Sequence, residues 1–152
     1  MDTQENRIKI AIPISIGSHK GADETLWALK VEDNKAKIDN IPVHVNNVSL
    51  SDIVEYGKSQ DNFIFNFVKV IEKSGIKTIR LSYKDSLLKN RTKIFKEKIF
   101  PKLQSLGCSY EGSPEIIAIS VPKSTDLDQV VKELNEFKDK GYEIEIADPG
   151  TN

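Results

Sequence analysis

Short runs of alternating apolar and polar residues fill the first half of the chain. Apolar side chains recur at every second position in 8–12 and again in 25–31, a period typical of β-strands with one buried face. The Asp33-Asn34 pair predicts a hairpin turn into a partner strand over 35–39. The next alternating run, Ile41 to Val45, predicts a third short strand, which Pro42 would place at a sheet edge.

The strongest β-strand signal lies between Ile53 and Ile71. After a first run and a polar turn region (57–62), apolar residues from Phe63 onward occupy both parities, which predicts a strand covered on both faces. Short strands separated by turn signals about every 8 to 12 residues are typical of a small, strongly bent barrel. We therefore expect a β-rich, SH3-like small barrel over 8–75, preceded by a polar, flexible leader over 1–7.

The second half reads as strand, helix, strand, strand, helix, strand. The predicted strands are 78–83, 109–111, 115–121 and 142–147. This order is that of a split βαβ, or ferredoxin-like, sandwich, which we expect over 76–152. The predicted fold class is α+β, with a small-barrel-like half followed by a ferredoxin-like βαββαβ half.

Both predicted helices show end signals. Asn90 or Ser86 is the candidate N-cap of the first helix, and Ser124 or Thr125 is the candidate N-cap of the second. Pro101 lies inside the first helix and removes one backbone hydrogen bond, so the helix should kink or restart there.

Composition limits the chemistry. The chain has 152 residues, 38% of them hydrophobic and 30% charged, which is the profile of a soluble globular protein that we expect to be cytoplasmic. The single cysteine, Cys108, cannot form an internal disulfide, and with only His19 and His44 beside it we expect no metal site and no cofactor. A net charge of -1 argues against a general nucleic-acid binder.

Charge is unevenly distributed in the second half. Between Lys89 and Lys102 there are six basic residues and one acid, whereas Asp126 to Asp148 contains eight acids and three lysines. Two helices that solvate their outer faces with opposite charges would explain this pattern without any partner. The alternative is that the acidic block is a docking surface, and its candidate partner-binding residues are Asp128, Glu133, Glu136, Asp139, Glu143 and Glu145.

Other candidate residues have simple structural interpretations. Cys108 follows a helix end and is expected to be a small core residue, because the helix dipole there would raise its thiol pKa. His44 is expected to be a surface or partly buried residue. The loop from Gly17 to Gly21 contains His19 and Lys20 and has the ingredients of an anion cradle, although it matches no phosphate-binding motif.

Six short segments, in order and at similar separations, resemble the bacterial domain-of-unknown-function 4265 family. They are Glu24–Ala28, Asp39–Pro42, Leu50–Val54, Ser74-Gly75 with Thr78–Arg80, Leu106–Cys108 and Ala118–Pro122. The resemblance covers nearly the whole chain from Glu24 and implies one compact unit with no established activity. The chain departs from the family pattern at Val43-His44, where an aromatic residue is usual, and at Ile76, where a histidine is usual. The resemblance also implies a link to bacterial proteins that include immunity partners of secreted toxins.

Three functions are compatible with these patterns. We expect a non-enzymatic, protein-binding immunity protein that occludes the active site of a cognate toxin, for example a basic nuclease, with no membrane contact. The alternative is an RNA-binding or other nucleic-acid-binding regulator that uses the Lys89–Lys102 helix and exposed strand aromatics, although Trp27, Phe63, Phe65 and Phe67 are more simply explained as core. An enzyme centred on the Gly17–Gly21 loop is the third possibility.

Overall fold

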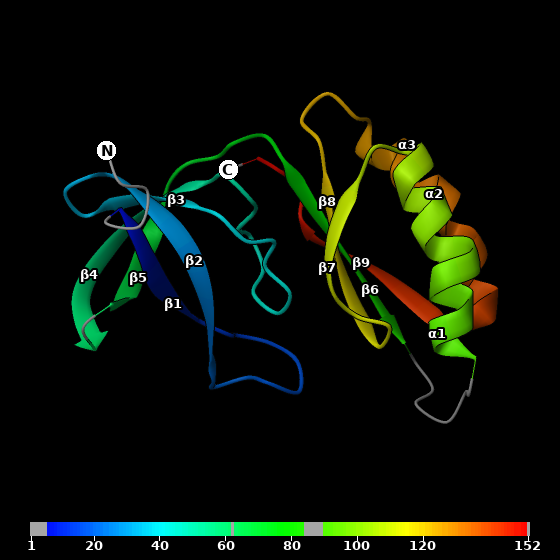
Figure 1. The fold of residues 1–152 in the computed structure, drawn as a ribbon, viewed down its shortest axis with the longest axis horizontal. Helices are drawn as coiled ribbons and strands as arrows, with labels where there is room; N and C mark the ends of the chain where they lie inside the picture. Colours follow the sequence, from blue (N-terminus) through cyan, green and yellow to red (C-terminus); the bar gives the residue numbers. More distant parts are fainter. Residues whose placement is uncertain (1–5, 62, 84–89, 152) are drawn as a thin grey trace.

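The computed structural model describes residues 6–61, 63–83 and 90–151, and it is an α+β protein, as predicted (Figure 1). A β-barrel lies at one end, a four-stranded sheet lies in the middle, and the helices cover the face of the sheet that is remote from the barrel. None of the helices in the described part of the chain is long and apolar enough to cross a membrane.

The barrel closes because its first strand pairs with two others. Its strands are β1 (Arg7–Pro13), β2 (Asp23–Glu32), β3 (Lys35–Ile38), β4 (Ile53–Asp61) and β5 (Ile64–Glu72). β1 is antiparallel to β2 and parallel to β5, and the predicted β2–β3 hairpin is present. Alternate residues of β1 point inward, so that Ile8, Ile10 and Ile12 join the barrel core. Arg7 is already part of β1, whereas residues 1–5 of the predicted leader lie outside the described residues.

The prediction that the 63–71 strand is covered on both faces is wrong. Phe65, Phe67 and Val70 pack against the barrel core, but Val68 is 51% exposed and Ile71 is 39% exposed. The inward positions switch parity along β5 because the β4–β5 ladder contains several register shifts. Apolar residues at both parities therefore reflect an irregular strand with an open outer face.

The predicted strand over Ile41 to Val45 is also wrong. These residues belong to an irregular loop, 39–52, that extends from β3 to β4 and lies between the barrel and the sheet. The apolar residues that suggested a strand are in part buried, as Ile41 and Val45 are, but burial does not alternate, because Pro42 is also buried and Val43 is only partly so. The backbone N–H groups of Val43, His44 and Val45, and the carbonyls of Val43 and Val45, are satisfied by charged side chains, described below.

The second half contains one antiparallel sheet with strand order β7-β8-β6-β9. Its strands are β6 (Lys77–Tyr83), β7 (Ser109–Ser113), β8 (Ile116–Val121) and β9 (Tyr142–Asp148). The helical segments are α1 (Arg91–Ile94), the π-helical η1 (Phe95–Ile99), α2 (Phe100–Ser105), α3 (Leu127–Leu134) and the 3-10 helix η2 (Asn135–Lys140). Ile79 and Leu81 of β6 point toward the helices and are fully buried, whereas Thr78 and Arg80 point toward the barrel half.

Both helix-end predictions are refined by the structure. The helical segments continue past Pro101, but a π-helical turn, η1, ends immediately before α2, and the Phe100 N–H donates to the Phe95 carbonyl. Asn90 is the N-cap residue of α1, although its side chain makes no capping hydrogen bond, and Ser86 lies outside the described residues. The N-cap of α3 is Asp126, not Ser124 or Thr125, and its carboxylate accepts from the Asp128 N–H at 3.1 Å.

A buried cluster of polar side chains joins the two halves. The Lys73 ammonium donates to Asp52 Oδ2 and to Asp148 Oδ2, each at 2.6 Å. Ser49 Oγ donates to Asp148 Oδ2 at 2.6 Å and lies 2.5 Å from Thr78 Oγ1. Asp52 and Asp148 are almost completely buried, so these hydrogen bonds and ion pairs take the place of contacts with water. We call these five residues the joint cluster.

Replacing Lys73 by Met should strongly destabilise the protein, because two buried carboxylates would lose their cationic partner. We expect the free energy of unfolding to fall by about 3–5 kcal/mol, measured by urea denaturation. Lys69→Met is the matched control, because this lysine is exposed on the neighbouring strand β5 and should change stability by less than about 0.5 kcal/mol. Equal effects of the two substitutions would show that the joint cluster does not stabilise the fold.

Candidate functional site

A cleft lies between the barrel half and the open face of the sheet. It has a volume of about 390 Å³ and is bordered by the 14–19 loop of the barrel, by His44 of the 39–52 loop, and by residues of β6, β8 and β9. Its lining combines apolar, imidazole, cationic and anionic groups: Ile14, Ile16, Gly17, Ser18, His19, His44, Arg80, Ser82, Tyr83, Glu115, Ile116 and Glu145. A concave site with a few polar groups among apolar ones is the general form of a binding site.

One wall of the cleft is held by side chains that replace a missing β-ladder. The carboxylate of Glu24, on β2, accepts from the backbone N–H groups of Val43, His44 and Val45 at 2.8, 2.8 and 2.9 Å. Three backbone donors on one carboxylate make strong, charge-assisted hydrogen bonds. A residue of the barrel therefore holds the loop by its backbone N–H groups.

Arg80 of β6 binds two backbone carbonyls of the same loop. Its Nε donates to the Val43 carbonyl at 2.6 Å, and its Nη2 donates to the Val45 carbonyl at 3.1 Å. Its Nη1 donates to Glu145 Oε2 at 3.0 Å. The guanidinium is almost fully buried, so it acts as a fixed cation that links the loop, the sheet and the rim of the cleft.

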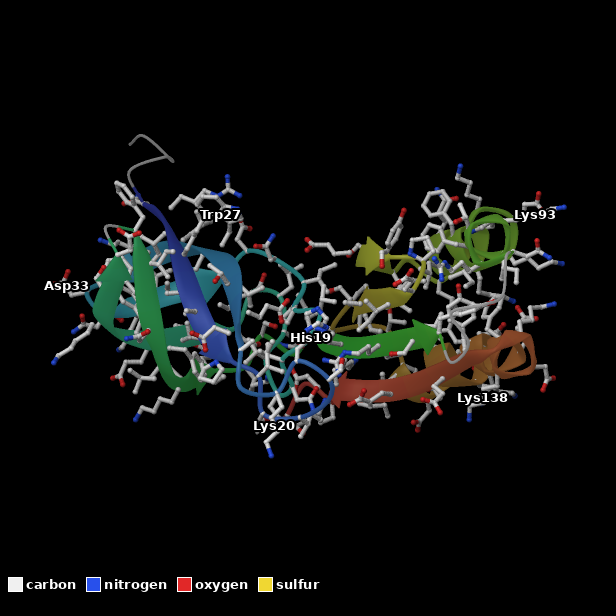
Figure 2. All side chains as sticks on the ribbon, turned by 90° about the horizontal axis from the view of Figure 1, so that it is seen from below. His19, Lys20, Trp27, Asp33, Lys93 and Lys138 are labelled. Atoms are coloured by element: carbon white, nitrogen blue, oxygen red, sulfur yellow. The ribbon has the colours of Figure 1, made fainter. Side chains whose placement is uncertain are left out.

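Two histidines meet in this cleft. The ring centroids of His19 and His44 are 4.4 Å apart, and Figure 2 shows His19 at the junction of the two halves. The loop that carries His19 is closed by hydrogen bonds between Ile14 and Ala22 and between Gly21 and Ile14. Gly17 within this loop has a φ of 86°, a left-handed conformation that favours glycine.

The anion cradle predicted for the Gly17–Gly21 loop is only partly assembled. Gly17, Ser18 and His19 border the cleft, but Lys20 points away from the body of the protein (Figure 2). The loop thus contributes backbone and an imidazole to the cleft, without the lysine that would neutralise an anion.

The pKa of His44 lies below its ordinary value of 6.5, chiefly because burial disfavours the charged imidazolium. The positive charges of His19 and Arg80 lower this pKa further, while the Glu24 carboxylate opposes the shift. His44 is therefore predominantly neutral at pH 7, so it can donate one hydrogen bond and accept another. No group of three or more metal-binding side chains occurs among the residues that the structure describes.

The six acidic candidates lie on two different faces. Asp128, Glu133, Glu136 and Asp139 belong to α3 and η2, on the helix layer. Glu143 and Glu145 lie on β9 and alternate with Tyr142 and Ile144, which pack toward the helices, so these two carboxylates point to the opposite, barrel-facing side. They line a second hollow of about 470 Å³ together with Lys138, and Glu145 also borders the cleft.

Part of the acidic block is paired with the basic block. Lys102 of α2 lies 3.3 Å from Glu133 and 3.4 Å from Glu136. This is the charge pairing between helices that the sequence allowed without any partner. Asp128 and Asp139 are both exposed, and neither forms an ion pair within the described part of the chain.

Cys108 is buried in the helix-side core, as predicted, and burial raises the pKa of its thiol. The prediction that four aromatic residues form core is correct for Phe65 and Phe67 only. Trp27 and Phe63 lie on the outer wall of the barrel, where Phe63 is 69% exposed.

Sequence reasoning missed the residues that build the cleft. Glu24 and Arg80 each lie within a family-like segment, but nothing in the local pattern separates them from other charged residues on strands. Arg80 lies between apolar Ile79 and Leu81 in the central strand of a predicted sheet. A cation at such a position was the one signal that the arginine itself is buried and has polar partners.

Residues 24–144 match the family described as domain of unknown function DUF4265. The chain belongs to this family. The resemblance inferred from its six segments is thereby confirmed, and Glu24, His44 and Arg80 all lie within the matched region.

This DUF4265 chain is also similar in fold to a hypothetical protein from Neisseria gonorrhoeae whose crystal structure is known. The two are 17% identical, with a TM-score of 0.72, and the similarity covers 97% of this chain and 96% of the other. At this identity the similarity shows the fold alone. No curated protein matches the chain.

The lowered pKa of His44 should make stability depend on pH. The unfolded state, with a pKa near 6.5, binds a proton more readily than the folded state does. The free energy of unfolding should therefore fall as the pH is lowered through about 6.5 toward the folded-state pKa, and urea denaturation between about pH 7.5 and pH 5.5 would measure this.

His44→Gln should flatten this pH dependence, because it removes the titrating group. In an NMR titration, His19→Gln should raise the pKa of His44, since it removes one of the positive charges that lower it. A His44 that titrates above 6.5 would contradict the electrostatic account of the cleft.

Proposed function

We propose that this DUF4265 protein is a non-enzymatic, cytoplasmic protein-binding module, and that it is an immunity protein that neutralises a cognate bacterial toxin by occluding its active site. The observation that carries the proposal is the arrangement of carboxylates around a concave surface of the sheet. Glu115 and Glu145 border the cleft, and Glu143 lies beside Glu145 in the adjoining hollow. A basic segment of the partner fits this surface by shape and by charge.

The charge state of the lining supports this choice of partner. The nitrogens of Arg80 are committed to the Val43 and Val45 carbonyls and to Glu145. His44 is predominantly neutral at pH 7, for the reasons given above. The carboxylates of Glu115 and Glu145 are partly exposed and already form ion pairs, with Arg91 at 2.7 Å and with Arg80 at 3.0 Å. A cationic surface such as that of a nuclease would approach these carboxylates and compete with the two arginines for them.

The six acidic residues enter this proposal in two sets. Glu143 and Glu145 are the set that lines hollows, so they are the first candidates for contact. Asp128, Glu133, Glu136 and Asp139 on the helix layer form the second set, in which Lys102 already neutralises part of the charge. Binding through the second set would use the opposite side of the molecule.

We further infer that the two halves are an SH3-like small barrel and a ferredoxin-like βαββαβ sandwich. The closed order of β1 to β5 supports the first assignment, and the order β7-β8-β6-β9 with helices on one face supports the second. Both architectures host many activities, so the function is argued from the surface alone.

The direct test is co-expression of the tagged protein with the product of the neighbouring gene. We expect a stoichiometric complex and loss of the neighbour's toxicity. Failure of the neighbouring product to bind, or toxicity that persists despite complex formation, would contradict an immunity role.

Neutralising Glu115 and Glu143 by substitution to Gln should slow association with the partner by about tenfold at low ionic strength, because long-range attraction would be reduced. Stopped-flow or surface-based kinetics would measure the rate. Asp128→Asn with Asp139→Asn is the matched control, since it removes the same charge from the helix layer. A larger effect of the control pair would move the docking surface to that layer, and no effect of either pair would contradict an acidic docking surface.

A further inference from the structure

Cationic and aromatic side chains alternate on the outer wall of the barrel. Arg7, Lys9, Trp27 and Phe63 line a hollow of about 370 Å³. The guanidinium carbon of Arg7 lies 4.1 Å from the centroid of the Trp27 ring, and Lys9 Nζ lies 4.8 Å from the same ring. Phe63 is the most exposed of the large hydrophobic residues that the structure describes.

Strand register brings these residues together. Lys9 is paired directly with Trp27 across the β1–β2 ladder, and the Lys9 N–H donates to the Phe63 carbonyl at 2.9 Å. Arg7 and Lys9 alternate with Ile8 and Ile10, which fill the barrel core, so both cations point outward.

A third cation extends the wall. Lys37 on β3 is paired with Leu29, which is itself paired with Arg7 across β2 and β1. Lys37 is exposed. Cations on β1 and β3 therefore flank β2, whose residues at these positions are Trp27 and Leu29. Lys37 lies outside the hollow itself and also borders a neighbouring one that contains Glu72.

We propose that this wall binds single-stranded nucleic acid, with one base stacked on Trp27, a neighbouring base on Phe63, and phosphates on Arg7, Lys9 and Lys37. Such binding requires accessible aromatic rings beside cations, because bases stack and phosphates pair with positive charge. Here the phenyl ring of Phe63 is exposed and the indole of Trp27 is partly exposed. In the free protein Arg7 and Lys9 lie over the indole through cation–π contacts. A base that stacks on the same face of Trp27 takes the place of the cation there, which then turns to the neighbouring phosphate.

An acidic peptide would satisfy the cations but not the rings. It offers carboxylates to Arg7, Lys9 and Lys37, whereas nucleobases supply a flat, sequence-independent partner for the exposed phenyl ring of Phe63 and the partly exposed indole of Trp27. The overall charge of -1 does not oppose local binding, because the row of cations is confined to one wall.

The basic helix is not part of this surface. Lys93 of α1 and Trp27 lie in opposite halves of the molecule (Figure 2). The exposed lysines Lys93, Lys96 and Lys98 therefore serve as a matched control with three cations on a different half.

Trp27 is the single tryptophan of the chain, so its fluorescence reports on this site alone. Titration with oligouridylate or oligothymidylate of about 12 nucleotides at low salt should quench it, and the two strands would distinguish RNA from DNA. The logarithm of the binding constant should fall with the logarithm of salt concentration with a slope near about -2, as expected for three phosphate contacts on a single strand.

Variants are compared by anisotropy of a labelled oligonucleotide. Trp27→Leu should weaken binding by about 5- to 100-fold, as should Phe63→Ser, whose exposed side chain can be removed without disturbing the core. Arg7→Gln with Lys9→Gln should lower both affinity and the salt slope, whereas Lys93→Gln, Lys96→Gln and Lys98→Gln together should leave both unchanged.

Several results would overturn the proposal. They are the absence of binding at low salt, equal quenching by polyglutamate or by inorganic polyphosphate, and an equal loss of affinity in the helix variant. Because this wall does not include the carboxylates of the cleft, failure here leaves the protein-binding proposal intact, and the reverse also holds.

Discussion

The arrangement of the two halves depends on one buried ammonium group. Lys73 leaves the barrel at the end of β5 and places its charge between Asp52, from the loop before β4, and Asp148, at the end of β9. Buried carboxylates of this kind are costly without a cation, so the relative position of the barrel and the sheet that satisfies all three groups is strongly preferred over others. Ser49 and Thr78 complete the polar contacts from either side. The cleft lies between the same two halves, and its shape is therefore fixed by charge pairing at their joint.

Charged side chains also hold the 39–52 loop in place. Glu24 accepts from the N–H groups of its 43–45 segment and Arg80 donates to the carbonyls of Val43 and Val45, so this segment is ordered without regular structure. This places His44 in the cleft opposite His19, and it also explains how a cation can be buried in the centre of a sheet face. Arg80 donates from Nε and Nη2 to two carbonyls of the loop, and from Nη1 to Glu145 in an ion pair. Removing the charge of either Glu24 or Arg80 would leave part of the loop backbone without its acceptor or donor.

The sequence predicted most of the strands and helices, but not the contacts between them. The period of β1, the β2–β3 hairpin and the α+β order follow from local alternation, which is a property of each segment alone. The loop at 41–45 and the open face of β5 were missed because alternation and apolar content report burial, not which group satisfies the backbone. The joint cluster contains residues as far apart in sequence as Ser49 and Asp148. No local pattern distinguishes its two acids, Asp52 and Asp148, from the other acidic residues among the 23 in the chain. The same holds for the meeting of His19 and His44, which requires the fold to bring two loops together.

The parallel pairing of β1 with β5 has a consequence for how the chain is made. During synthesis β1 leaves the ribosome before β5, so one of its two neighbours becomes available only when residues 64–66 have emerged. Until then the strand has an open edge that can pair with other chains. Contacts so distant in sequence also slow folding, because a long loop must close before they form. Asp148 is translated later still, so a barrel can close on the nascent chain well before the sheet half is locked against it.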